Sequence, residues 1–190
     1  FDLATEQFIS AVPSHSGAIR NCSGGVTPWG TWYTCEETDT GTMSRTDTGA
    51  GGVRHGYVFE VGPLGPLPGS ESQPFPDMGN FSHEAMATDP ATGITYLTED
   101  GPSADGDVGS GFYRFLYNVP GHAEFGGRLQ MLAIKGRPQI NFQETGCESR
   151  AFPVRWVNIE TPDPDVAGGD ASTFQQGFAG GGANFRRLEG

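Results

Sequence analysis

Short runs of aromatic and β-branched residues recur along the chain, and clusters of Gly, Pro, Asp and Ser separate them. This pattern is typical of β-strands that are bounded by tight turns. It predicts strands over residues 30–35, 56–61, 94–98, 111–116, 129–134 and 154–159. One segment, residues 4–12, instead places Phe8, Ile9 and Val12 on one face at helical spacing, and there we expect a short helix.

The first half of the chain contains a weak internal repeat. Residues 33–37 (YTCEE) align with residues 96–100 (YLTED), and each copy is an aromatic-led strand that ends in two acidic residues. A second aromatic strand follows in each copy, at 55–60 and 110–115. Repeats of roughly 40–50 residues built from strands are typical of propeller blades, although a β-sandwich would also fit. We therefore expect an all-β chain in which residues 1–190 form a single β-propeller domain.

The composition agrees with an ordered β-protein. The 190 residues include 30 Gly and 14 Pro, but also 13 Phe, 5 Tyr and 3 Trp, which supply apolar area to offset the loss of chain entropy. The 11 basic and 23 acidic residues give a net charge of −12, which repels nucleic-acid phosphates and anionic lipids. Nucleic acids are therefore not expected partners. The acidity itself reflects either solubility or carboxylates that are neutralised by bound cations.

The three cysteines, Cys22, Cys35 and Cys147, cannot all pair with one another, so at least one thiol is free or is a metal ligand. No stretch reaches the roughly 20 apolar residues of a membrane span. The first residues lack the basic region and the apolar core of a signal peptide. We expect any signal peptide to have been removed or to lie outside the chain.

The run Cys35-Glu36-Glu37 combines a soft thiolate with two hard carboxylates at the end of a predicted strand. Thiolates favour iron, zinc or copper, whereas carboxylates favour calcium, magnesium or manganese, so the run suggests a mixed metal cluster. Side chains alternate along a strand, which would let Cys35 and Glu37 converge on one site while Glu36 points away. On the local sequence alone, a buried structural cysteine followed by two solvated acids is the favoured alternative.

Three further groups could take part in the same chemistry. His83 and Glu84 are neighbouring ligands or acid–base groups, although such a pair often only caps a turn. Asp100 lies in the repeat partner of the first acidic run and suits a calcium site or a solvated turn. Near the end of the chain, Arg187 could hold a phosphate bidentately or form a surface ion pair with Glu189.

Taken together, these motifs resemble those of the PhoX-type alkaline phosphatases. The run over residues 21–37 (NCSGGVTPWGTWYTCEE) is similar to the signature of this family. Short motifs follow in the family's order at 55–60, 81–85, 96–100 and 111–115. Residues 185–190 (FRRLEG) resemble the later Arg-x-Glu-Gly motif.

The resemblance implies a six-bladed β-propeller, of which this chain would cover roughly the first half to two-thirds. It also implies phosphomonoester hydrolysis by an iron–calcium cluster in a protein exported to the periplasm or beyond, often by the twin-arginine route. Carried over to this sequence, Arg187 and Asn21 would hold the phosphate oxygens. The metal ligands would be Cys35 and Glu84 for iron, Glu189 for the cluster, and Glu36, Glu37 and Asp100 for calcium or bridging positions.

Three interpretations of the function follow from the sequence. The first is a metal-dependent phosphomonoesterase that acts on a small phosphoester. The absence of a Ser-centred nucleophile-elbow motif agrees with this class. The second is a non-catalytic extracellular propeller that keeps metals for stability and serves as a binding or assembly module. A third reading is a propeller hydrolase that acts on phytate or lactones.

Overall fold

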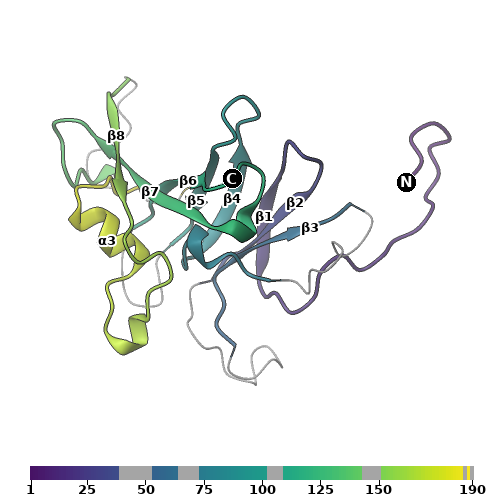
Figure 1. The fold of residues 1–190 in the computed structure, drawn as a ribbon, viewed down its shortest axis with the longest axis horizontal. Coiled ribbons are helices and arrows are strands. Elements are labelled where there is room, and N and C mark those ends of the chain that lie inside the picture. Colours follow the sequence, from purple (N-terminus) through teal and green to yellow (C-terminus); the bar gives the residue numbers. More distant parts are fainter. Residues whose placement is uncertain (39–52, 64–72, 102–108, 143–150, 186–187, 189–190) are drawn as a thin grey trace.

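The computed structural model describes residues 1–38, 53–63, 73–101, 109–142, 151–185 and 188. In this part of the chain, eight strands form two antiparallel sheets that lie side by side (Figure 1). The smaller sheet has the order β1-β2-β3, with strands Asn21–Val26, Trp32–Glu36 and Val58–Val61. The larger sheet has the order β4-β5-β6-β7-β8, with strands His83–Thr88, Thr95–Glu99, Phe112–Tyr117, Gly127–Ile134 and Val154–Asn158.

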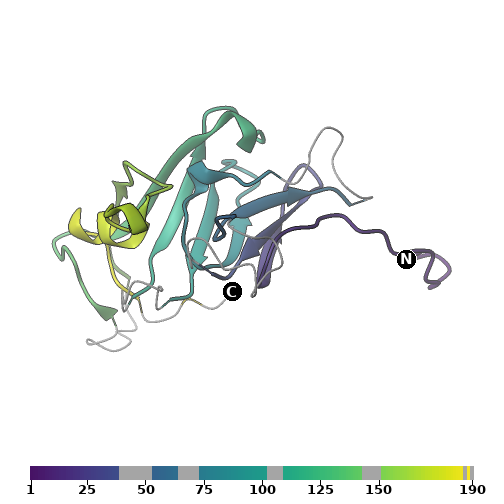
Figure 2. The same cartoon turned by 90° about the horizontal axis from the view of Figure 1, so that it is seen from below.

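The helical elements whose bounds the structure describes are short. The α-helix α3 spans Thr173–Ala179, and a capping box between Ser172 and Gln175 starts it. Its Phe174 side chain joins the core, so the helix covers β7 (Figure 2). Three single 3₁₀ turns complete the list, η1 at Pro76–Met78, η2 at Ala123–Phe125 and η3 at Val166–Gly168. No helix among the described residues combines the length and apolar character needed to cross a bilayer.

All six strands predicted from the hydrophobic pattern are confirmed, and their bounds move by no more than two residues. The alternation has the expected cause. In β6, Tyr113 and Phe115 are fully buried while their neighbours face the other side of the sheet, and in β7 Leu129 and Met131 are buried in the same way. These side chains meet Tyr33 and Cys35 of the smaller sheet, so one core fills the space between the two sheets.

The sequence repeat is also a structural repeat. The order β1-β2-β3 is repeated by β4-β5-β6, and the first residue of each copy pairs with the glutamate that ends the second strand: Asn21 with Glu36, and His83 with Glu99. Both copies then contain a β-bulge at the same place. No closed ring of sheets occurs within the described residues, and the propeller stays a prediction.

Residues 4–12 do not form the expected helix, and that prediction is wrong. An isolated turn closed by a bridge between Asp2 and Gln7 occupies this region, and Phe8, Ile9 and Val12 remain mostly exposed. The N-terminal segment extends away from both sheets (Figures 1 and 2). A short isolated helix is marginal in water, and the described residues provide no apolar surface to cover the stripe that was to stabilise it.

Strands β1 and β4 and helix α3 were not predicted. The sequence of β1 contains two glycines because its backbone lies directly against another strand: a Cβ atom at Gly25 would collide with the backbone carbonyl oxygen of Met86 in β4. The same glycines remove the β-branched pattern by which a strand is normally recognised. The contact therefore explains both the close packing and the missed prediction.

We expect Gly25→Ala to destabilise the fold by about 3 kcal/mol or more, because the added methyl group meets backbone atoms that cannot move aside. Gly136→Ala is the control. Its added Cβ meets open space, and the positive φ of 76° should cost only about 1–2 kcal/mol. Urea unfolding followed by circular dichroism measures both. Equal losses in the two variants would contradict the close contact between β1 and β4.

Candidate metal centre

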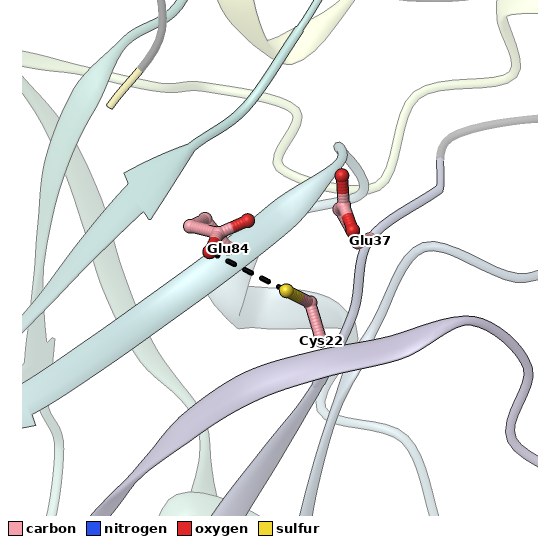
Figure 3. Close-up of side chains that lie close together, drawn as sticks. All are labelled: Cys22, Glu37 and Glu84. Atoms are coloured by element: carbon pink, nitrogen blue, oxygen red, sulfur yellow. Dashed lines mark hydrogen bonds between the residues drawn. The ribbon is translucent and has the colours of Figure 1, made fainter. Parts of the chain in front are cut away.

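Three side chains from both sheets converge on one point, and we call this group the cluster: Cys22, Glu37 and Glu84. One ligand atom from each, the sulfur and two carboxylate oxygens, lies within 4.8 Å of the others. The Cys22 thiol donates a hydrogen bond of 3.4 Å to Glu84 Oε1. Figure 3 shows Cys22 on β1, Glu84 on the facing β4 and Glu37 just after the end of β2.

The β-bulges place two of these side chains. In β1, Cys22 and Ser23 together lie opposite the single residue Cys35, because the pairing shifts between Asn21 and Gly24. In β4, the corresponding bulge contains Glu84. A bulge re-aims a side chain relative to the regular strand, and bulges are frequent beside functional sites. Packing of β1 against β4 then brings the two re-aimed side chains together.

Desolvation and the nearby negative charges make the Cys22 thiol hard to ionise in the metal-free protein. Partial burial, followed by the hydrogen bond and charge of Glu84 and then the effect of Glu37, raises the pKa of Cys22 from 9.0 to about 11. Among the described residues, no basic side chain forms an ion pair with Glu37 or Glu84. A bound cation would relieve this repulsion.

Cys35, the predicted iron ligand, lies outside the cluster. Its side chain is fully buried and belongs to the core between the sheets. Burial comes first among the causes that raise its pKa to about 12, followed by the charges of Glu84 and Cys22. The buried thiol therefore lies on the core side of the cluster, close enough for the cluster's charges to affect its pKa.

Glu36 is held by hydrogen bonds to the protein itself. Its Oε1 accepts from the backbone N–H of Ile19 at 3.0 Å and from His55 Nδ1 at 2.8 Å. Its Oε2 accepts from the backbone N–H groups of Gly56 and Tyr57 at 2.7 and 3.1 Å. These four bonds satisfy a carboxylate that is completely buried. The structure thus places Glu36 as an anchor between β2 and β3 and does not bring it into the cluster.

The second copy of the repeat supports this distinction. Glu99 is equally buried, and its Oε2 accepts from the Gly111 N–H and from the Tyr113 hydroxyl, both at 2.7 Å. Asp100 takes the place of Glu37 in this copy: each donates its backbone N–H to the residue that precedes the bulged strand. Asp100 is buried and is not part of the three-residue cluster.

Two other predicted groups flank the cluster. Asn21 is the first residue of β1 and lies next to Cys22 in the sequence. It is exposed, and its side-chain amide donates to Thr34 Oγ1 at 2.7 Å. His83 is fully buried against Phe81, and burial lowers its pKa to about 4. The neutral ring donates through Nε2 to the Gly79 carbonyl at 3.1 Å, which fits a structural role. Arg187, Glu189 and Cys147 lie outside the described residues.

The donor set of the cluster fits a transition metal better than calcium alone. One thiolate with two carboxylates combines soft and hard ligands, and iron accepts both, whereas calcium binds oxygen. The three side chains would supply only part of a coordination sphere. The arrangement defines an all-β protein with a candidate thiolate–carboxylate metal centre at the junction of two sheets.

Comparison with known proteins places this chain in a family. Its structure is similar to a solved structure of Pseudomonas fluorescens PhoX in complex with vanadate, a transition-state analogue, with a TM-score of 0.55 and 19% sequence identity. The match covers 92% of this chain and 37% of that chain, so this chain spans little more than a third of that relative. No curated protein matches the sequence. The family described as alkaline phosphatase PhoX matches residues 3–190, and the chain therefore belongs to this family.

Sequence reasoning placed Glu37 and Glu84 among the metal ligands but did not select Cys22. A signal was available, because Cys22 lies within the family-like run over residues 21–37 and at least one of the three thiols had to be free or a ligand. The alternation rule directed attention to Cys35 instead. That rule fails at a bulge, where two successive residues share one partner.

We expect the Cys22 thiol of the metal-free protein to react slowly with iodoacetamide near neutral pH. Because its pKa is raised to about 11, the thiolate fraction should grow about tenfold per pH unit and level off only near that pH. Glu84→Gln removes one charge and should speed the reaction several-fold at pH 8. Mass spectrometry of the peptide that contains Cys22 follows the rate.

Glu160→Gln is the matched control for this experiment, since Glu160 is an exposed carboxylate outside the cluster. It should leave the rate unchanged. The description of the cluster would be contradicted if the alkylation rate reached half its maximum at a pH close to 9. Equal rates in the Glu84→Gln and Glu160→Gln variants would contradict it as well.

Metal content separates the two candidate sulfur ligands. After loading with iron and calcium, Cys22→Ser should lose iron, because it removes the sulfur that lies among the carboxylates. Cys35→Ser should retain iron, since its sulfur lies in the core. Elemental analysis of the purified variants measures both. Loss of iron in Cys35→Ser alone would return the ligand role to Cys35.

Proposed function

We propose that this chain carries part of the metal centre of a secreted, PhoX-type phosphomonoesterase. The observation that carries the proposal is the convergence of Cys22, Glu37 and Glu84 across two sheets in a member of the alkaline phosphatase PhoX family. A structural relative is known in complex with vanadate, a transition-state analogue, which supports chemistry at a phosphoryl group. The two sheets would be consecutive blades of a six-bladed propeller.

The cluster residues would bind iron, and calcium would occupy neighbouring oxygen sites. We propose Cys22 as the sulfur ligand, with Glu37 and Glu84 as the carboxylate ligands. Asp100 and Glu189 remain candidates for further oxygen ligands. The bound metals would supply positive charge that attracts and stabilises the phosphate oxygens. Cys35 and Glu36 would support the cluster without binding the metal. Cys35 would pack in the core, and Glu36 would fix the end of β2.

The chain's own residues would orient the substrate. Asn21 lies beside Cys22 at the exposed end of β1, and its amide has a second N–H besides the one that binds Thr34. That group would donate to a phosphate oxygen. Arg187 would hold two further oxygens through its planar guanidinium group. Both groups bind the developing charge more strongly as the phosphoryl group is transferred.

A phosphatase assay with defined metals tests the proposal. The protein that contains this chain, loaded with iron and calcium, should hydrolyse p-nitrophenyl phosphate and lose that activity when a chelator removes the metals. Glu84→Gln should lower the rate by roughly 100-fold or more, because it removes a ligand charge. Glu160→Gln should retain the full rate.

Metal content measured on the same samples separates the two function classes. Binding of calcium without iron, together with no hydrolysis, would contradict the phosphatase and favour a metal-stabilised binding or assembly module. The proposed compartment is the periplasm or the extracellular space. It rests on the family to which the chain belongs.

A further inference from the structure

Two cysteines lie opposite each other on adjacent strands beside the cluster. The pairing of β1 with β2 runs from Asn21 opposite Glu36 to Gly24 opposite Thr34, so the bulged Cys22 faces Cys35 across the ladder. Both thiols are free. Opposed residues of an antiparallel pair have Cα atoms about 4.5–5.5 Å apart. This separation falls within the roughly 4.4–6.8 Å that a disulfide spans.

The two thiols also approach the same neighbour. Cys22 donates a hydrogen bond to Glu84, and the charges of Glu84 and Cys22 both act on Cys35. Cys35 belongs to the core between the two sheets, and Cys22 reaches Glu84 of the larger sheet, so both side chains point from the smaller sheet toward the larger one. The pair therefore meets both the spacing and the direction that a cross-strand disulfide requires.

We propose that Cys22 and Cys35 form a disulfide when the cluster holds no metal, and that metal binding and disulfide formation exclude each other. The oxidant would be a small disulfide such as oxidised glutathione. One oxidised glutathione and the two protein thiols give the Cys22–Cys35 disulfide and two reduced glutathione molecules, so that atoms and electrons balance. The metal clause rests on the proposed function, whereas the disulfide itself does not.

Exposure fixes the order of the two steps. Cys22 is exposed and Cys35 is buried. The Cys22 thiolate attacks the glutathione disulfide, forms a mixed disulfide and releases one glutathione thiolate. The Cys35 thiolate then attacks the Cys22 sulfur and displaces the second glutathione. A metal bound to the Cys22 sulfur would slow the first step, because donation to the metal lowers the nucleophilicity of the sulfur.

Oxidation of the metal-free chain with oxidised glutathione tests the proposal by peptide mapping without reduction. Chymotrypsin cleaves at Trp29, Trp32 and Tyr33, between the two cysteines. We expect two peptides that stay joined until a reductant is added, and a protein mass that falls by two hydrogen atoms. The Cys147→Ser variant confirms the assignment by removing the third thiol. Attachment of glutathione to Cys22 without the link, or a link to Cys147, would overturn the proposal.

Two variants test the order of reaction. Cys35→Ser should stop at the mixed disulfide, with one glutathione on Cys22. Cys22→Ser should leave Cys35 unmodified, because the buried thiol does not meet the oxidant. Circular dichroism checks that both variants fold, and the result with the unsubstituted chain stands if either one does not. Glutathione on Cys35 in folded Cys22→Ser would contradict the proposed order.

Loading the chain with iron and calcium before oxidation, with air excluded, tests the metal clause. The link should then form at least tenfold more slowly than in the metal-free chain. Equally fast formation in a chain shown to hold iron would mean that Cys22 is not a ligand, which contradicts the proposed metal site but leaves the disulfide intact. Failure of the link in the metal-free chain would instead overturn the disulfide whatever the metal content.

Discussion

Direct contact between the backbones of β1 and β4 determines where the candidate ligands lie. Gly25 makes this contact possible because it has no Cβ atom to meet the Met86 carbonyl. Each strand brings its own bulge to the junction, and each bulge turns one donor toward the other strand. The donors come from segments far apart in the sequence. Their distance is therefore set by the packing of the two backbones against each other.

Acidic side chains near this junction fall into two kinds that differ in their partners. Glu36 and Glu99 end the second strand of each repeat copy and are buried. Both accept hydrogen bonds from backbone N–H groups just before the next strand. Glu37 and Glu84 instead face the Cys22 sulfur, without an ion-pair partner among the described residues. For the first kind, hydrogen bonds offset the free-energy cost of removing the carboxylate from water. The second kind concentrates charge at a point that a cation can occupy.

The elements that the sequence predicted well are those whose side chains face the core in strict alternation. Strands such as β6 combine aromatic residues at period two, and that pattern depends only on neighbours along the chain. Strand β1 and the role of Cys22 depend on a strand some 60 positions away, which the local pattern does not contain. The helix expected near Phe8 failed for the same reason: its apolar face implied a partner that the described fold does not place there.

The two bulges hold a cysteine in one copy of the repeat and a glutamate in the other, on the same backbone framework. Strand pairing sets the direction of a bulged side chain, and it does so whatever that side chain is. The donor atom can therefore differ between the two copies of the repeat while the backbone stays the same. In such a scaffold a single substitution would exchange sulfur for oxygen at the candidate metal centre while leaving the sheets as they are, so that the metal preference of the site would change one ligand at a time.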